Sequence, residues 1–349
     1  MPDPVSAPVR VLIVDDSLLM RQLLAEILGA DPGIEVVGAA ADAYAAREAI
    51  KRLAPDVITL DIAMPGMDGL TFLRNLMRLR PMPVVMVSTL TAQGAPAGLE
   101  ALALGAVDVM AKPQPLGERG LGDYAGALRA KIRAAARAHV QPVGGTLRCA
   151  PLPAGGARAD RKLIAIGGSA GGTEAIRAVL AAMPADAPPT VIVQHIPASF
   201  SAAFAERLDR HSPMRVVHLE ADRTLQPGHA YVAPGGRHLR VVRSGGQWWG
   251  RLGDDPPQRR HRPSVDVLFE SVARCAGAQA AAALLTGMGD DGARGLLALR
   301  AAGALTIAQD EDSSLIWGMP GAAVALDAAC EVLPLSQIAQ RLLGAVAER

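Results

Sequence analysis

Aromatic residues, cysteines and net charge are all scarce in this chain of 349 residues. Aromatic side chains make up only 3% of it, so stacking platforms for single-stranded nucleic acid are not expected. The formal net charge is only +1, so the chain has no excess of basic residues of the kind that general nucleic-acid-binding proteins carry. The three cysteines, Cys149, Cys275 and Cys330, form no metal-spaced pair and cannot all be joined in disulfides. This cysteine usage is typical of the reducing cytoplasm.

Long apolar runs are absent as well, so no segment is expected to insert into a membrane. The first residues, Met1-Pro-Asp-Pro, lack a basic region followed by an apolar stretch, and no signal peptide is expected. Half of the residues are nevertheless hydrophobic, which is enough for two substantial cores. The length favours two domains.

Strands and helices alternate over the first part of the chain, residues 1–138. Such alternation predicts an α/β domain with a doubly wound parallel sheet. The expected strands are Val9–Val14, Val36–Ala39, Val57–Leu60, Val84–Val87 and Val107–Met110.

Residues 139–160 are rich in proline and glycine and have no periodicity, which predicts a linker. A second alternating series then predicts a second domain over residues 161–349. We also expect a hairpin between Ala230–Ala233 and His238–Val242, and a loop over residues 258–264 that ends in a helix N-cap at Ser264. The other expected strands are Leu163–Ile166, Val191–Gln194, Arg215–His218, Ala280–Leu285 and Leu305–Ala308.

Ser169 lies in the glycine-rich segment Ile166-Gly-Gly-Ser-Ala-Gly-Gly-Thr173, between a short apolar strand and an amphipathic helix. A strand-to-helix turn exposes the hydroxyl and directs free backbone N–H groups of the helix start towards a ligand. This arrangement suits a serine nucleophile whose product is an oxyanion. The alternatives are a phosphate-binding turn, although the two common phosphate-binding glycine motifs do not match, and a plain helix N-cap.

A serine nucleophile needs a base and a group that orients this base. His195 ends the strand that follows the Ser169 unit, so it is expected at the same edge of the sheet, although a lone strand-end histidine is more often structural. Asp290 and Asp291 follow the strand Ala280–Leu285. Either aspartate is a candidate for the orienting acid, and either is equally compatible with a helix cap.

Acidic residues follow two strands of the first domain. Asp15 and Asp16 come after Val9–Val14, and Asp61 comes after Val57–Leu60. In a doubly wound sheet these ends form the ligand-binding edge, and three carboxylates there favour a hard cation such as Mg²⁺. Ser88 and Lys112 end the next two strands and present a hydroxyl and an ammonium group to this edge. Taken singly, Asp16 is better explained as a helix cap and Lys112 as a surface lysine, but all five residues at successive strand ends are a much stronger signal.

These residues resemble the receiver domain of bacterial two-component response regulators, which has a flavodoxin-like fold. The resemblance implies that Asp61 accepts a phosphoryl group from a chemotaxis histidine kinase and that Asp15, Asp16 and Asp61 bind Mg²⁺. It further implies that Lys112 contacts the phosphoryl group and that Ser88 senses it. The matching segments are Val14-Asp-Asp-Ser17, Leu60-Asp-Ile-Ala-Met-Pro-Gly-Met-Asp-Gly69, Val87-Ser88 and Lys112-Pro113.

Six segments of the second domain carry a further resemblance: Gly167-Gly-Ser-Ala-Gly-Gly-Thr-Glu-Ala-Ile176, Val193-Gln-His-Ile-Pro197, Ala233-Pro-Gly235, Arg262-Pro-Ser-Val-Asp-Val-Leu-Phe269, Leu285-Thr-Gly-Met-Gly-Asp-Asp-Gly292 and Trp317-Gly-Met-Pro320. Together they are similar to the chemotaxis protein-glutamate methylesterase family, CheB, which implies a Rossmann-like fold. The resemblance implies a catalytic triad of Ser169, His195 and Asp291, and no cofactor for the esterase reaction. We expect backbone N–H groups at Ala170 and near Met288 to hold the oxyanion.

The two resemblances together imply a cytoplasmic, phosphorylation-regulated serine hydrolase. It would demethylate glutamate methyl esters on methyl-accepting chemoreceptors, release methanol and deamidate selected glutamines. Arg207, Arg210 and the cluster Arg259, Arg260 and Arg262 would either face an acidic receptor helix or form solvated surface. The alternative is a response regulator whose output domain is not an enzyme and binds a nucleotide or a protein partner at the glycine-rich turn.

Overall fold

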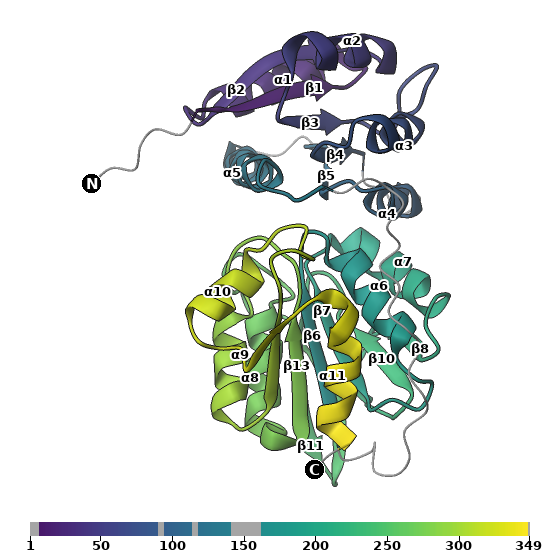
Figure 1. Cartoon of the computed structure of the whole chain (residues 1–349), viewed down its shortest axis with the longest axis vertical. Coiled ribbons are helices and arrows are strands. Elements are labelled where there is room, and N and C mark those ends of the chain that lie inside the picture. Colours follow the sequence, from purple (N-terminus) through teal and green to yellow (C-terminus); the bar gives the residue numbers. More distant parts are fainter. Residues whose placement is uncertain (1–6, 90–93, 114–117, 141–161, 348–349) are drawn as a thin grey trace, which may run out of the picture. The chain divides into compact units, whose positions relative to one another are not determined.

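A computed structural model describes residues 7–89, 94–113, 118–140 and 162–347 of the chain. The chain divides into two compact units, Met1–Thr146 and Leu147–Arg349, which are coloured purple to blue and teal to yellow (Figure 1). The predicted linker, residues 139–160, lies outside the described residues except for its first two positions, so its bounds remain a prediction. No helix in the described parts is both long and apolar enough to cross a membrane.

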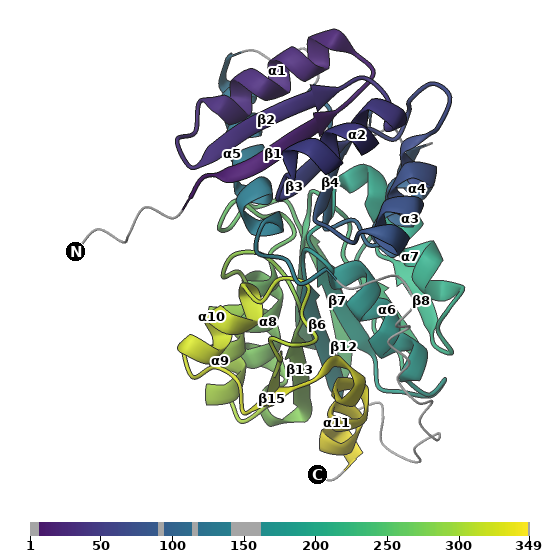
Figure 2. The same ribbon diagram turned by 45° about the horizontal axis from the view of Figure 1, so that its top comes forward.

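The first unit contains a parallel five-stranded sheet in the order β2-β1-β3-β4-β5. This is the flavodoxin-like order, so the predicted doubly wound fold is confirmed. Helix α1 packs against α5, and α3 packs against α4 (Figure 2). The strands are β1 Val9–Val14, β2 Ile34–Ala40, β3 Val57–Leu60, β4 Val84–Ser88 and β5 Asp108–Ala111; the helices are α1 Leu18–Gly29, α2 Ala43–Leu53, α3 Gly69–Leu79, α4 Ala95–Ala103 and α5 Glu118–Ala135.

The second unit is built on a parallel seven-stranded sheet in the order β15-β14-β13-β6-β7-β10-β8. Figure 1 shows α8 and α9 on one face and α6 and α11 on the other, as in a doubly wound fold. The strands are β6 Leu163–Gly168, β7 Thr190–Gln194, β8 Arg215–His218, β10 His229–Val232, β13 Ala280–Leu284, β14 Leu305–Gln309 and β15 Glu331–Leu333; the helices are α6 Gly172–Ala182, α7 Ala198–Asp209, α8 Val265–Cys275, α9 Ala293–Ala301, α10 Met319–Ala325 and α11 Leu335–Ala347.

Strand β6 begins the second unit and lies at the centre of its sheet. The chain adds β7 on one side of β6 and later adds β13 on the other, so the strand order reverses at β6. Every residue of β6, β7 and β13 is buried, as expected for strands covered by helices on both faces. Ligands of such sheets bind beyond the carboxyl ends of the strands at this reversal. The fold therefore places the predicted nucleophile turn, which follows β6, at the most favourable position for a binding site.

The predicted hairpin between Ala230–Ala233 and His238–Val242 is wrong. Strand β10 lies in the parallel sheet between β7 and β8, whereas β11 (His238–Ser244) pairs with β12 (Gln247–Gly253) in a separate antiparallel sheet that β9 (Arg223–Thr224) completes. The hairpin turn is Gly245-Gly246, with φ angles of 58° and 80°. Two successive positive φ values match the right-handed twist of the paired strands, and glycine adopts them without strain.

Candidate functional site

The carboxylates of the first unit meet at one edge of its sheet. Asp15 follows β1 and Asp61 follows β3, and these two strands are paired neighbours. Asp15 and Asp61 are buried, while Asp16 is exposed. One carboxylate oxygen from each of the three residues lies within 4.8 Å of the others. Mutual repulsion at this separation is relieved by a cation, and an all-oxygen set suits a hard divalent ion.

Lys112 bridges the two buried carboxylates. Its Nζ lies 2.7 Å from Asp15 Oδ2 and 2.7 Å from Asp61 Oδ2. Burial lowers the pKa of Lys112, but the hydrogen bonds to both carboxylates outweigh it and raise this pKa. Burial also raises the pKa of Asp15, against the opposing effects of Lys112 and the Ser17 N–H. Asp61 Oδ1 is buried and has no hydrogen-bond partner among the described residues, which leaves it available for a metal ion or a phosphoryl group.

Neither of the plainer interpretations of this edge holds in the structure. The N-cap of α1 is Ser17, not Asp16. Lys112 is not a surface lysine, because its side chain is 13% exposed and forms two ion pairs. Ser88 ends β4 as predicted and is buried, and its carbonyl accepts a hydrogen bond from the Lys112 N–H at 2.8 Å. The five predicted residues are therefore brought to one edge.

Ser169 occupies a tight turn between β6 and α6. Its N–H donates to the Thr286 carbonyl at 3.0 Å, and its carbonyl accepts from the Gly172 N–H at 2.8 Å and from Gln194 Nε2 at 2.7 Å. The N-cap of α6 is Gly171, with φ 75°, so Ser169 is not the helix cap. A Cβ on Gly287 would lie 2.7 Å from the Ser169 Cβ, so the loop after β13 passes directly against the serine.

His195 and Asp291 form a hydrogen-bonded pair, whose side chains are 7% and 1% exposed. His195 Nε2 lies 2.8 Å from Asp291 Oδ2, and Asp291 also accepts hydrogen bonds from the Ser264 hydroxyl at 2.8 Å and from the Val265 and Asp266 N–H groups. Burial alone would raise the pKa of Asp291, but the hydrogen bond and charge of His195, followed by the Val265 and Ser264 donors, lower it to about 2. The carboxylate therefore stays ionised, as an orienting acid must.

The remaining ring nitrogen of His195, Nδ1, is buried and has no hydrogen-bond partner among the described residues. No hydrogen bond joins it to Ser169 in the described part of the chain, and catalytic hydrogen bonds of substrate-free enzymes often form only in the complex. Because Nε2 faces Asp291, Nδ1 is the nitrogen available to act as a base.

The two candidate acids after β13 take different roles. Asp290 is exposed and forms an ion pair with Arg259, whereas Asp291 faces His195. Neither aspartate caps α9, whose N-cap is Gly292. Ser169, His195 and Asp291 thus follow the three adjacent strands β6, β7 and β13.

Two backbone donors flank the serine. Among the described residues, neither the Ala170 N–H nor the Met288 N–H has a hydrogen-bond partner. Ala170 directly follows Ser169, and its carbonyl accepts from the Thr286 hydroxyl at 3.0 Å. Met288 follows Gly287, the residue in contact with Ser169. Both N–H groups are therefore available for an oxyanion.

Several supporting side chains were not predicted for this site. Ser264 caps α8 as predicted, but its hydroxyl also donates to Asp291. Gln194 Nε2 donates to the Ser169 and His195 carbonyls. The ring of His261 stacks on that of His195. Two sequence signals could have indicated them: Ser264 stands at a predicted helix start, and Gln194 directly precedes His195.

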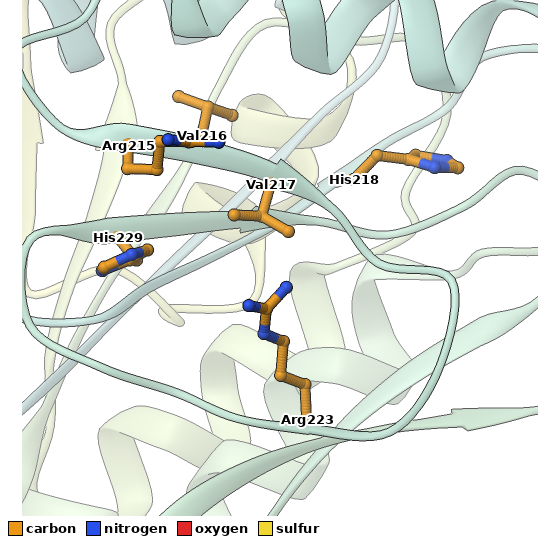
Figure 3. A pocket seen from close by; sticks show the side chains of 6 residues that line it. All are labelled: Arg215, Val216, Val217, His218, Arg223 and His229. Atoms are coloured by element: carbon orange, nitrogen blue, oxygen red, sulfur yellow. The ribbon is translucent and has the colours of Figure 1, made fainter.

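A pocket of about 430 Å³ lies elsewhere in the second unit, beside the edge strand β8 (Figure 3). His218 lines it, and its Nε2 lies 3.1 Å from the Ser201 hydroxyl. Ser201 is 2% exposed and donates to the Ala198 carbonyl of its own helix, so this serine is not accessible as a nucleophile. The lining residues are Arg215, Val216, Val217, His218, Arg223 and His229.

Comparisons with known proteins show the family to which the two units are similar. The sequence model of the CheB methylesterase family matches residues 164–342, and that of the response regulator receiver domain matches residues 11–118. A protein-glutamate methylesterase/protein-glutamine glutaminase of Xanthomonas campestris pv. campestris is 58% identical over 98% of both chains, and one of Pseudomonas aeruginosa is 51% identical over 98% of both. The crystal structure of the Thermotoga maritima CheB methylesterase catalytic domain matches with a TM-score of 0.51 and 32% identity, covering 52% of this chain and 97% of that one.

Proposed function

The chain belongs to the CheB methylesterase family and is a receiver-regulated protein-glutamate methylesterase and protein-glutamine glutaminase, and we propose that Ser169, His195 and Asp291 carry out its hydrolytic reaction. The observation that supports this assignment best is the hydrogen-bonded His195–Asp291 pair. The two residues follow β7 and β13, the strands on either side of β6, which presents Ser169. A nucleophile, a base and an orienting acid in this arrangement define a serine hydrolase.

The reaction proceeds by acyl transfer. His195 Nδ1 takes the proton of the Ser169 hydroxyl, whose oxygen attacks the γ-carbonyl carbon of a glutamyl methyl ester. The tetrahedral intermediate collapses, its bond to the methoxy oxygen breaks, and His195 returns the proton to the leaving methanol. Water then attacks the acyl-enzyme with the same assistance and releases glutamate and free Ser169. Asp291 holds the imidazole in place and stabilises its charged form.

The intermediate carries an oxyanion, which the Ala170 and Met288 N–H groups stabilise. Loss of a single donor of this kind typically lowers kcat about 10²–10³-fold. The glutaminase reaction uses the same groups, except that His195 protonates leaving ammonia instead of methanol. The esterase reaction needs no cofactor, because Ser169, His195 and two backbone donors supply every proton transfer and charge stabilisation.

Phosphorylation of the first unit controls the enzyme. Asp15, Asp16 and Asp61 would hold Mg²⁺, which would neutralise charge on the phosphoryl group. The fit is supported by the three clustered carboxylates and by Asp61 Oδ1, which has no hydrogen-bond partner among the described residues. Asp61 accepts the phosphoryl group from a chemotaxis histidine kinase. Lys112 then pairs with the new charge, and Ser88 at the end of β4 responds to it.

The substrates are methyl-accepting chemoreceptors, and the enzyme acts on their cytoplasmic parts. The rival proposal, an output domain that only binds a nucleotide or a partner, is not favoured. It leaves the hydrogen-bonded His195–Asp291 pair unexplained, and the Xanthomonas campestris and Pseudomonas aeruginosa relatives are both named as methylesterases. The composition also argues against nucleic acid as a partner.

Release of methanol from a methylated receptor fragment tests the proposal. Ser169→Ala and His195→Ala should each lower kcat by several orders of magnitude while the receptor fragment still binds. The control is Ser199→Ala, which replaces an exposed serine of α7. Near-normal methanol release by purified Ser169→Ala protein would refute the triad.

A further inference from the structure

The imidazole of His261 lies flat against that of His195. The ring centroids are 3.7 Å apart and the ring planes differ by 3°. The hydrogen bond from His195 Nε2 to Asp291 anchors one edge of the ring. This bond alone does not prevent the ring from rotating about the hydrogen-bond axis. A flat ring in van der Waals contact opposes that rotation, because turning His195 out of plane would drive its atoms into His261.

A strained turn presents the His261 ring. Gln258 and His261 exchange two backbone hydrogen bonds of 3.0 and 2.8 Å, which closes a two-residue turn. The two central residues are Arg259, with φ 48°, and Arg260, with φ 69°. Two positive φ values define a type I′ turn, which strongly prefers Asn-Gly. L-residues with a side chain are disfavoured in this conformation, so the surrounding structure must hold the turn.

Arg259 supplies that hold. Its Nε lies 3.1 Å from Asp266 Oδ2 in α8, and its second ion pair is with Asp290. The hydrogen bond to Asp290 raises the pKa of Arg259 above its ordinary value. Asp266 donates its N–H to Asp291, and Asp290 is the neighbour of Asp291 in sequence. The arginine therefore ties the turn both to the segment that carries the orienting acid and to the start of α8, which donates hydrogen bonds to this acid.

We propose that the turn Gln258–His261 is a positioning element for the general base. His261 clamps the face of the His195 ring while Asp291 holds its edge, so that Nδ1 stays directed at the Ser169 turn. His261 is a positioning residue and not a catalytic one, since it exchanges no proton in the reaction. This inference rests on the proposed function, because it requires His195 to be the base. This positioning role explains why the turn keeps a strained backbone at Arg259 and Arg260.

The decisive comparison is between His261→Ala and His261→Phe in the full chain. The alanine variant lacks the ring, and the phenylalanine variant keeps a flat face of similar width. We expect His261→Ala to lower kcat for methanol release about tenfold to 100-fold, the range that misplacement of a reacting group by about 1 Å can cause. KM should change by less than about threefold. His261→Phe should keep most of the wild-type kcat. His211→Ala, at an exposed histidine after α7, is the matched control and should leave both constants unchanged.

A spectroscopic readout separates positioning from general loss of structure. In NMR spectra, ring-current shielding from the stacked ring moves the carbon-bound ring protons of His195 upfield. These resonances should move downfield in His261→Ala and remain shielded in His261→Phe. Arg259→Ala, which removes both ion pairs of the turn, should reproduce the kcat loss and the downfield shift.

Three results would overturn the inference: an unchanged kcat in His261→Ala, a loss in KM alone, or equal losses of kcat in the alanine and phenylalanine variants. Failure of the proposed function is distinguishable, because in that case His195→Ala itself would retain activity. If His195→Ala is inactive and His261→Ala is fully active, only the positioning role is wrong.

Discussion

The hydroxyl of Ser264 donates a 2.8 Å hydrogen bond to Asp291 while it accepts one from the Val267 N–H at the start of α8. One buried side chain thus caps a helix and holds the orienting acid. Ser264→Ala should lower the free energy of unfolding by about 2 kcal/mol, because it removes a cap and a bond to a charged group. It should also lower kcat, since Asp291 loses one of its donors.

Urea unfolding followed by tryptophan fluorescence measures this effect in the full chain, because Trp248, Trp249 and Trp317 all lie in the second unit. The exposed serine of α7, changed in Ser199→Ala, serves as the control. A stability change below about 0.5 kcal/mol, which is usual for surface substitutions, would contradict the role of Ser264.

The acidity of Asp291 predicts how stability depends on pH. Its pKa is about 2 in the folded chain against an ordinary value of 3.8, so the ionised form stabilises the fold. This contribution is complete above about pH 4 and is lost as the pH falls through about 2. The gap in unfolding free energy between wild type and Asp291→Asn should therefore narrow as the pH falls from about 4 towards 2. A gap that stays unchanged over this acid range would disagree with the low pKa.

The pKa of Asp266 is shifted in the opposite direction, so this residue should give the opposite dependence of stability on pH. Burial, reinforced by the charge of Asp291, raises the pKa of Asp266 to about 6 against the opposing hydrogen bond of Gly295 and charge of Arg259. The folded chain therefore binds this proton more tightly than the unfolded chain does. The resulting stabilisation is present below pH 3.8 and is lost as the pH rises through about 6. Asp266→Asn should be more stable than wild type at pH 7, by on the order of 3 kcal/mol.

The same pair of proteins should have equal stability at about pH 2.5, where Asp266 is protonated in both the folded and the unfolded chain. Urea unfolding at the two pH values gives both numbers. Destabilisation by Asp266→Asn at pH 7 would mean that the ion pair with Arg259 outweighs burial.

Strain at Arg260 predicts a stabilising substitution. Arg260→Gly removes the side chain that disfavours φ 69° and adds flexibility to the unfolded chain, so the net gain should be about 0.5 kcal/mol. Arg210→Gly is the matched control, because this exposed arginine has φ −66° and no left-handed strain. The control should be destabilised, and a similar loss in Arg260→Gly would argue against strain in the turn.

Metal and phosphoryl chemistry at the first unit is tested with a small-molecule phosphodonor. Wild type should incorporate one phosphoryl group only when Mg²⁺ is present, and chelation of Mg²⁺ should abolish incorporation. Asp61→Asn should incorporate none and should keep the basal rate of methanol release while losing its response to the phosphodonor. Asp42→Asn changes the carboxylate that caps α2 to an equally good cap, and it should be labelled normally. Equal labelling of Asp61→Asn would place the phosphoryl group elsewhere.

Local patterns in the sequence determined most of the strands and the sheet edges at which the candidate residues meet. Apolar runs of four to six residues separated by amphipathic segments predict parallel strands, whose carboxyl ends share one edge. This is why Asp15, Asp61 and Lys112, each at a strand end, were predicted to meet. The same reasoning placed Ser169 and His195 at one edge, while the choice between Asp290 and Asp291 rested on family resemblance.

Only the tertiary structure decided the rest. Strand β10 reads locally like one arm of a hairpin, yet it inserts between β7 and β8, because burial on both faces outweighs the local turn signal. Three contacts join segments that are far apart in the chain. They are the stacking of His261 on His195, the hydrogen bond from Ser264 to Asp291 and the ion pair of Arg259 with Asp290. Such contacts depend on how strands and loops pack in three dimensions, and no periodicity or spacing in the sequence records them.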